Sequence, residues 1–581
     1  MSTPDRHLFD LGTTPLHKGV TLIEASAGTG KTFTIAGLVV RLIVEHDLRI
    51  QEILVATYTV PATAELRSRI RQFLERARLA FERGEAEEEF LRELLKWHGE
   101  CRREITLRLE RAVRSFDEAP VFSLHGFCHR MLNDKAFESG VLFDAELVPD
   151  PSSLLQEVTD DFWRLQYYNT SPLFPALALR EGFKPALFRK LLETVTRHPE
   201  IKTIPSPPES FEKIKAGLES SFESMRQLWA SDGPTIRRLF SGEGGRWAKG
   251  NMHQGKPEKM ALLLEGVHEA LTLPVVTPSM LEGFEKINTS SLRRATLAKA
   301  ATPEHPFFDQ CERFIELQSH YGLSLQQAFL AWSENELARR KIQKNILGFD
   351  DLQTRLRDAL RAEGGGKLAA SIRGRFKAAL IDEFQDTDPV QYEIFTRIYA
   401  EQEGHWLFFI GDPKQAIYAF RGADVFTYLE AARQAQHEFT LGTNRRSESN
   451  LVGAVNHLFS LNPNPFVVEG IGFHPVKADG RQDKAPLKLN GQQVAPFQLW
   501  LCNEPEPLSK DEAGAWIVRA VAGEIARLLD GQATIGESRL KPEDIAVLVA
   551  THRQAEQVQA ALHRLRIPNV VHSHDSVVPS A

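Results

Sequence analysis

The stretch that most constrains this chain is Leu22–Thr34, which reads LIEASAGTGKTFT. An apolar, strand-like run leads through small residues into Gly30-Lys31-Thr32, and an apolar helical pattern follows. This order is typical of a phosphate-binding loop, in which backbone N–H groups and the positive end of a helix hold phosphate oxygens. The pattern G-x4-G-K-[ST] is met except at its first position, where Ala25 replaces glycine. We expect Lys31 to reach the β- and γ-phosphates and the Thr32 hydroxyl to bind Mg²⁺. The alternative is a chance turn of small residues.

Composition narrows the class of protein without naming a reaction. The chain has 581 residues, of which 42% are hydrophobic and 25% charged, as in globular proteins of several domains. No apolar run approaches membrane-spanning length and the first residues lack a signal-peptide core, so we expect a cytoplasmic protein without a membrane segment. The net charge of −7 argues against a uniformly basic nucleic-acid binder but leaves room for a basic channel. Reduced thiols are expected at Cys101, Cys128, Cys311 and Cys502, which are far apart in sequence.

A second chemical centre is predicted where the apolar run 378–381 ends in Asp382-Glu383. Hydrolysis of a nucleotide needs one carboxylate to hold Mg²⁺ and a neighbour to position and deprotonate the attacking water. Adjacent acids at the end of a buried strand supply both groups, because that end points toward the phosphate loop. The pair alone is a weak signal, and the phosphate loop in the same chain makes it strong.

Two further strand ends carry residues suited to a single strand of nucleic acid. The strand expected over 53–57 ends beside Tyr58, and a basic helix opens near Pro61. The strand expected over 406–410 runs into GDPKQAIYAFRGAD, which holds the polar Gln415 and a stacking-plus-cation set. Rings stack on bases, while hydroxyls and cations contact phosphate. The alternatives are an ordinary strand–helix unit and a loop of packed aromatic residues. The residues meant are Thr57, Tyr58, Tyr418, Phe420 and Arg421.

The remaining segments give less chemistry. Residues 83–118 are charged and helical, 121–132 read as a short strand-like stretch, and 150–345 as a helical insertion without motifs. His125 lies near Cys128 and His129, but three such residues on one turn make a poor metal site. A last unit is expected as a strand over 545–549 followed by a helix over 552–565.

Six blocks taken together resemble the motifs of UvrD/Rep-type superfamily 1 DNA helicases. In chain order these blocks are ASAGTGKT, TYTVPATAEL, SLHGFC, LIDEFQDTDPVQ, GDPKQAIYAFRGAD and LGTNRRS. They cover roughly the first 150 and the last 235 residues. The wording EASAGTGKTFTIA and the long helical insertion are most similar to the RecB-type branch, the beta subunits of exodeoxyribonuclease V, with AddA-type helicase–nucleases as the close alternative.

The resemblance implies roles for individual residues. Glu383 is expected to be the general base, Asp382 and Thr32 the Mg²⁺ ligands, Gln415 the link between γ-phosphate and DNA, and Arg446 a γ-phosphate contact. ATP is expected to be held by Ala25, Ser26, Ala27, Gly28, Thr29, Gly30, Lys31, Thr32, Phe33 and Arg445. His125 joins the five residues named above as an expected contact of single-stranded DNA.

The chain also departs from the family pattern. No glutamine precedes the phosphate loop to read adenine, since the first is Gln51. Phe33 stands where many relatives have arginine, and Arg445 where they have an aromatic residue, so adenine selectivity is in question. Nothing resembling motifs V and VI, or a nuclease signature, follows. We therefore expect an N-terminal fragment that turns over ATP poorly alone, because an arginine finger contributes roughly 10³–10⁵ in rate.

The resemblance predicts an α/β fold of the P-loop NTPase class, with a RecA-like parallel sheet, a helical insertion and part of a second RecA-like domain. The expected division is domain 1A over 1–145 and 346–440, with a short helical insertion near 80–118. Domain 1B is expected over 146–345 and an incomplete domain 2A over 441–581.

It also predicts an ATP-dependent 3′-to-5′ helicase subunit of a RecBCD-type helicase–nuclease in double-strand break repair. Single- and double-stranded DNA and RecC- and RecD-like subunits are the partners it implies. The alternative function is a module that binds single-stranded DNA or partner subunits without productive ATP turnover.

Overall fold

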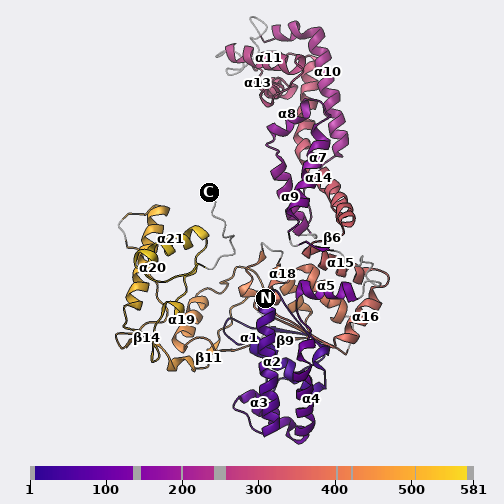
Figure 1. The fold of residues 1–581 in the computed structure, drawn as a ribbon. Helices are drawn as coiled ribbons and strands as arrows, with labels where there is room; N and C mark the ends of the chain where they lie inside the picture. Colours follow the sequence, from indigo (N-terminus) through magenta and orange to yellow (C-terminus); the bar gives the residue numbers. More distant parts are fainter. Residues whose placement is uncertain are drawn as a thin grey trace. The chain divides into compact units, whose positions relative to one another are not determined.

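The computed structural model describes residues 7–134, 146–148, 150–197, 201–240, 257–400, 404–419, 423–503 and 506–571. The chain divides into two compact units (Figure 1). One comprises residues 1–131 and 357–581, and the other comprises residues 132–356. Each unit has its own hydrophobic core.

The first unit is built on a seven-stranded sheet in which every described strand pair is parallel. The strand order is β1-β9-β2-β8-β7-β3-β4. The bounds are β1 His7–Leu8, β2 Gly19–Glu24, β3 Ile53–Thr57, β4 Val121–Ser123, β7 Ala378–Ile381, β8 Trp406–Gly411 and β9 His437–Thr440. β3, β7 and β8 are buried along their length, as expected for parallel strands covered on both faces. The predicted α/β class and the strands over 53–57, 378–381 and 406–410 are confirmed.

Helices of the same unit pack against this sheet and against one another. α1, Lys31–His46, is buried over most of its length, and α2, Val60–Arg83, lies between it and α4. The other helices here are α3 Glu89–His98, α4 Arg102–Arg114, α5 Leu124–Asp134, α15 Phe349–Arg361, α16 Gly365–Arg375, α17 Pro389–Phe395 and α18 Val425–Gln434. The boundaries between the units fall within α5 and α15.

The strand-like reading of 121–132 is wrong beyond Ser123, because α5 begins at Leu124. The buried side chains of this segment recur every three or four residues, at Leu124, Phe127 and Met131. That spacing places them on one helical face, and it outweighs the strand-like composition.

The second unit is helical. Its elements are α7 Ser152–Tyr167, α8 Leu173–Arg180, α9 Pro185–Arg197, α10 Phe211–Arg238, α11 Pro257–Thr272, α12 Glu282–Lys286, α13 Thr289–Ala295, α14 Pro306–Lys344 and the short strands β5 Glu146–Leu147 and β6 Ile346–Leu347. α10 and α14 pack along each other around Phe222 and Phe314. Among the described residues of the chain, no helix combines the length and the apolarity needed to cross a bilayer.

Residues 441–571 form helices and short strands. Helices α19 Ser449–Ser460, α20 Lys510–Leu529 and α21 His552–Arg564 accompany strands β10 Thr443–Asn444, β11 Lys477–Ala478, β12 Leu487–Leu489, β13 Gln492–Gln493, β14 Ala533–Ile535 and β15 Ser538–Arg539. The predicted strand over 545–549 is wrong: this segment joins no sheet of the described residues, and Leu548 is 95% exposed. Apolar composition marks a segment suited to a sheet, but a strand also needs a neighbour to accept its backbone hydrogen bonds.

Replacing Leu380 by alanine should weaken the sheet locally. Its side chain is fully buried in β7, and deleting such a side chain costs about 2–5 kcal/mol. Faster hydrogen exchange in peptides covering β7 and β8 measures the effect. Leu458→Ala, on the exposed part of α19, is the matched control and should stay within about 0.5 kcal/mol of the original chain. Unchanged exchange in the Leu380 variant would contradict this account of the core.

Candidate functional site

The phosphate loop joins β2 to α1 and is shaped by two glycines. Gly28 and Gly30 have φ of +81° and +94°, values that side-chain-bearing residues rarely adopt. A Cβ on Gly28 would also lie 2.6 Å from the side-chain nitrogen of Asn444. Ala25 is not among the residues with positive φ, and its N–H donates to the Gly411 carbonyl at 2.9 Å. Alanine therefore replaces the first glycine of the motif without backbone strain.

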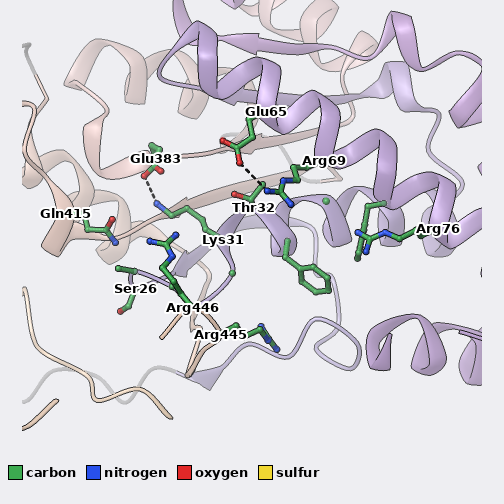
Figure 2. A pocket seen from close by; sticks show the side chains of 16 residues that line it. Ser26, Lys31, Thr32, Glu65, Arg69, Arg76, Glu383, Gln415, Arg445 and Arg446 are labelled. Atoms are coloured by element: carbon green, nitrogen blue, oxygen red, sulfur yellow. Dashed lines mark hydrogen bonds and ion pairs between the residues drawn. The ribbon is translucent and has the colours of Figure 1, made fainter. Parts of the chain in front are cut away.

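A cavity of about 420 Å³ opens over this loop (Figure 2). Four of the predicted catalytic residues, Lys31, Glu383, Gln415 and Arg446, line it, although they come from four separate stretches of the sequence. The other lining residues are Ser26, Ala27, Gly28, Gly30, Thr32, Phe33, Ala36, Glu65, Arg69, Phe73, Arg76 and Arg445. Of the predicted nucleotide-binding residues, Ala25 and Thr29 do not line the cavity and are buried beneath it.

The acidic pair has two different environments. The Glu383 carboxylate forms an ion pair with the Lys31 ammonium and accepts a hydrogen bond from Gln385 Nε2 at 2.7 Å. Glu383 has a φ of +50°, an uncommon conformation that turns the chain at the end of β7. Asp382 is buried, and its N–H donates to the Ala56 carbonyl at 2.8 Å. Its Oδ1 has no hydrogen-bond partner among the described residues.

Burial changes the acidity of this region. It raises the pKa of Asp382 from 3.8 to about 7, with the nearby Glu383 charge as the second cause. The same two causes raise the pKa of Asp386 to about 6. A buried carboxylate whose oxygen lacks a partner fits a hard divalent cation such as Mg²⁺, because the cation replaces the missing hydrogen bonds and balances the charge. The Thr32 hydroxyl, beside Lys31 in the cavity lining, supplies a second oxygen of the kind Mg²⁺ accepts.

One end of the cavity is lined by aromatic rings and arginines. Phe33 meets Phe73 edge-to-face with ring centroids 4.8 Å apart. The guanidinium of Arg445 lies 6.0 Å from the Phe33 ring centre, and that of Arg76 4.8 Å from the Phe73 ring centre. Such a set offers planar and cationic surfaces to a nucleobase.

The α2 residues Arg69, Phe73 and Arg76 were missed as pocket residues by the sequence analysis, which treated this basic helix as a nucleic-acid element. Their spacing of four and three residues is the signal that places them on one face. Arg67 lies elsewhere: its side chain donates to the Asp117 carbonyl at 2.5 Å and has a structural role.

Asn444 fixes the two arginines against the phosphate loop. Its side-chain nitrogen donates to the Ala27 carbonyl at 3.0 Å, and its oxygen accepts from the Arg446 N–H at 2.9 Å. The Arg445 N–H donates to the Gly28 carbonyl at 2.8 Å. The two loops are thus joined by backbone and amide hydrogen bonds, which holds the arginine side chains beside the cavity.

The residues predicted to contact DNA are partly brought together. Tyr58 and Tyr418 stack with ring centroids 5.6 Å apart and an interplanar angle of 22°. His125 is half-buried on α5. Thr57 is fully buried at the end of β3, which argues against a direct contact with DNA. Phe420 and Arg421 lie outside the described residues, so the structure leaves these two predictions as they were.

The fold and the pocket define a P-loop nucleotide-binding protein of the α/β class. Comparison with known families matches residues 12–436 to the UvrD/REP helicase N-terminal domain, and the chain belongs to this family. Helicases of this kind bind nucleotide.

Three relatives show how the chain compares in length. It is 38% identical to the RecBCD enzyme subunit RecB of Escherichia coli (strain K12), covering 96% of this chain and 48% of the relative. It is 31% identical to the RecBCD enzyme subunit RecB of Haemophilus influenzae (strain ATCC 51907 / DSM 11121 / KW20 / Rd), covering 97% of this chain and 50% of the relative. It is 28% identical to the RecBCD enzyme subunit RecB of Mycolicibacterium smegmatis (strain ATCC 700084 / mc(2)155), covering 98% of this chain and 42% of the relative. The chain thus spans about half the length of these relatives.

Asp382→Asn should remove a pH dependence of stability. A carboxyl whose pKa is higher in the folded chain stabilises the fold below its unfolded pKa, and this contribution is lost as pH rises to about 7. Relative to the original chain, the variant should therefore gain roughly 2–3 kcal/mol of unfolding free energy between pH 5 and pH 8, and level off above pH 7. Urea unfolding in EDTA at several pH values measures the difference. Exposed Glu543→Gln is the control, and a pH-independent difference for Asp382→Asn would count against the burial argument.

Proposed function

We propose that this chain is the nucleotide-driven part of a 3′-to-5′ DNA helicase of the RecB type, which uses ATP with Mg²⁺ and moves along single-stranded DNA. The observation that carries the proposal is the convergence of Lys31, Glu383, Gln415 and Arg446 on one cavity over a phosphate loop. Family membership and the RecB relatives support it.

In this proposal the phosphates lie over the loop and the N-terminus of α1. Lys31 and Arg446 bring positive charge to the β- and γ-phosphates. Asp382 and Thr32 would hold Mg²⁺, and the bound ion would supply positive charge beside the phosphate oxygens. Glu383 takes the proton of the attacking water, and Gln415 contacts the γ-phosphate.

The base end differs from the family pattern in a way that can still bind a purine. Phe33 stands where many relatives have arginine, and Arg445 stands where they have an aromatic residue. Both residues line the cavity, with the guanidinium 6.0 Å from the ring centre. Stacking on a ring or a guanidinium is tolerant of base identity. We therefore propose weak discrimination between adenine and guanine nucleotides.

The stacked pair of Tyr58 and Tyr418 is the proposed platform for single-stranded DNA. Tyr58 directly follows β3, and Tyr418 lies in the segment after β8 that also holds the cavity residue Gln415. The sheet thereby gives a short mechanical route from nucleotide to base. Because the relatives are named as subunits of a RecBCD enzyme, we further propose RecC- and RecD-like subunits as partners. We also propose double-strand break repair as the process in which the chain acts and the cytoplasm as its location.

A second candidate function is a module that binds single-stranded DNA or partner subunits without useful turnover. Exposed apolar side chains in the last part of the chain favour it, since such surfaces commonly mark contacts with further protein. They include Leu499, Leu501, Leu548 and Val570.

ATP hydrolysis measured with and without a single-stranded oligonucleotide tests the proposal. Lys31→Ala should weaken nucleotide binding by at least tenfold, because the ammonium that reaches the phosphates is lost. Glu383→Gln should keep nucleotide binding while turnover falls by about 10²–10⁴, the usual contribution of a general base. Tyr418→Ala should weaken oligonucleotide binding by about 1–3 kcal/mol.

The pattern of results separates the candidates. Oligonucleotide-stimulated turnover that both active-site variants lose supports a working ATPase. Oligonucleotide binding without turnover, unchanged in both variants, supports the binding module. Absence of both nucleotide and oligonucleotide binding would overturn the proposed function.

A further inference from the structure

The carboxyl ends of β2 and β8 hold a buried charged cluster that the proposed function leaves unused. The Lys414 ammonium is paired with the Glu24 carboxylate and lies 2.7 Å from Asp412 Oδ1. The side chains of Lys414, Glu24 and Asp412 are only 9%, 3% and 2% exposed. Removing three charged groups from water costs free energy, and the ion pairs between these groups offset part of that cost.

Hydrogen bonds connect this cluster to the nucleotide cavity. Asp412 Oδ2 accepts from Gln415 Nε2 at 2.6 Å, and Gln415 lines the cavity. The Asp412 N–H donates to Gln385 Oε1 at 2.9 Å, and Gln385 Nε2 donates to Glu383 at 2.7 Å. Asp412 therefore connects the buried Lys414 directly to Gln415 and, through Gln385, to Glu383. Gln415 and Glu383 both line the cavity in which the γ-phosphate is proposed to bind.

The cluster is also tied to the phosphate loop. Glu24 is the last residue of β2 and pairs with Gly411 in the parallel ladder. The next residue, Ala25, donates its N–H to the Gly411 carbonyl at 2.9 Å. A Cβ on Gly411 would lie 2.7 Å from Gln385 Oε1, so the chain approaches closely here. The two strand ends and Gln385 are thus in direct contact.

We propose that Glu24 and Lys414 are a positioning pair that orients Gln415 for recognition of the γ-phosphate. With one oxygen of Asp412 held by Lys414, the other is turned toward the Gln415 amide, whose remaining polar atom is left for the nucleotide. Lys414 does not line the cavity, and we infer that it acts through Asp412. This inference rests on the proposed nucleotide site, and it adds two residues outside that site.

The test compares two nucleotides on the full 581-residue chain. A fluorescent ADP is displaced by ADP or by ATPγS in the presence of Mg²⁺, and the ratio of the two affinities measures recognition of the γ-phosphate. Glu24→Gln combined with Lys414→Met removes one negative and one positive charge, so the net charge of the cluster stays unchanged. The ratio should fall by about tenfold, as expected for one charge-assisted hydrogen bond, while the ADP affinity stays within about threefold.

Three further variants make the result specific. Gln415→Ala should lower the ratio to a similar extent, and adding it to the double variant should change little more. Lys414→Arg keeps the charge but alters its contacts, so it should lower the ratio even if the double variant does not fold. Lys377→Met breaks an ion pair between Lys377, which directly precedes β7, and Glu52, which directly precedes β3. These residues lie at the amino ends of the strands, away from the cluster, so this variant should leave the ratio unchanged.

Several outcomes overturn the inference. One is an unchanged ratio in the folded double variant or, where that variant does not fold, in Lys414→Arg. Equal loss of affinity for both nucleotides means a purely structural role, and an original chain that binds both equally has no recognition to position. If the original chain binds neither nucleotide, the proposed function fails as well, which distinguishes the two failures.

Discussion

The nucleotide pocket depends on the meeting of the carboxyl ends of parallel strands in a sheet whose inner strands are buried. β2, β7 and β8 are neighbours in the sheet, although β2 is separated from the other two by more than 350 residues of sequence. Parallel pairing brings their carboxyl ends together, and the chain leaves each end through a polar or acidic residue. Strand pairing alone therefore brings the phosphate loop, the pair Asp382-Glu383 and Gln415 close together.

This constraint explains how much could be predicted from the sequence. Apolar runs over 53–57, 378–381 and 406–410 are strands because parallel strands are apolar on both faces, a pattern that is readable without the fold. Short sequence motifs then locate Lys31, Glu383, Gln415 and Arg446, all of which line one cavity. Their individual roles stay predictions.

The remaining features depend on tertiary neighbours that composition does not reveal. Residues 545–549 have the pattern of a strand but no ladder partner among the described residues, so they form no strand, and Leu548 is exposed. Arg69 and Arg76 belong to the cavity only because α2 packs beside α1, and a basic helix alone does not indicate which face will be used. Lys414 reads as an ordinary loop lysine until its two carboxylate partners are seen.

The acidic groups at this edge are balanced in three different ways, and the differences match the roles proposed for them. One oxygen of Asp382 finds no hydrogen-bond partner in the described part of the chain, and the pKa of this carboxyl is raised to about 7, so Asp382 gains most from a cation. Asp412 is paired with the buried Lys414 ammonium, as expected for a positioning group. Glu383 is paired with Lys31, the residue proposed to bind phosphate. One ammonium cannot pair fully with both a phosphate and the Glu383 carboxylate. A phosphate that attracts Lys31 would therefore weaken the ion pair between Lys31 and Glu383. Nucleotide binding would thereby free the proposed base at the moment its substrate arrives, and the ion pair would keep that carboxylate occupied until then.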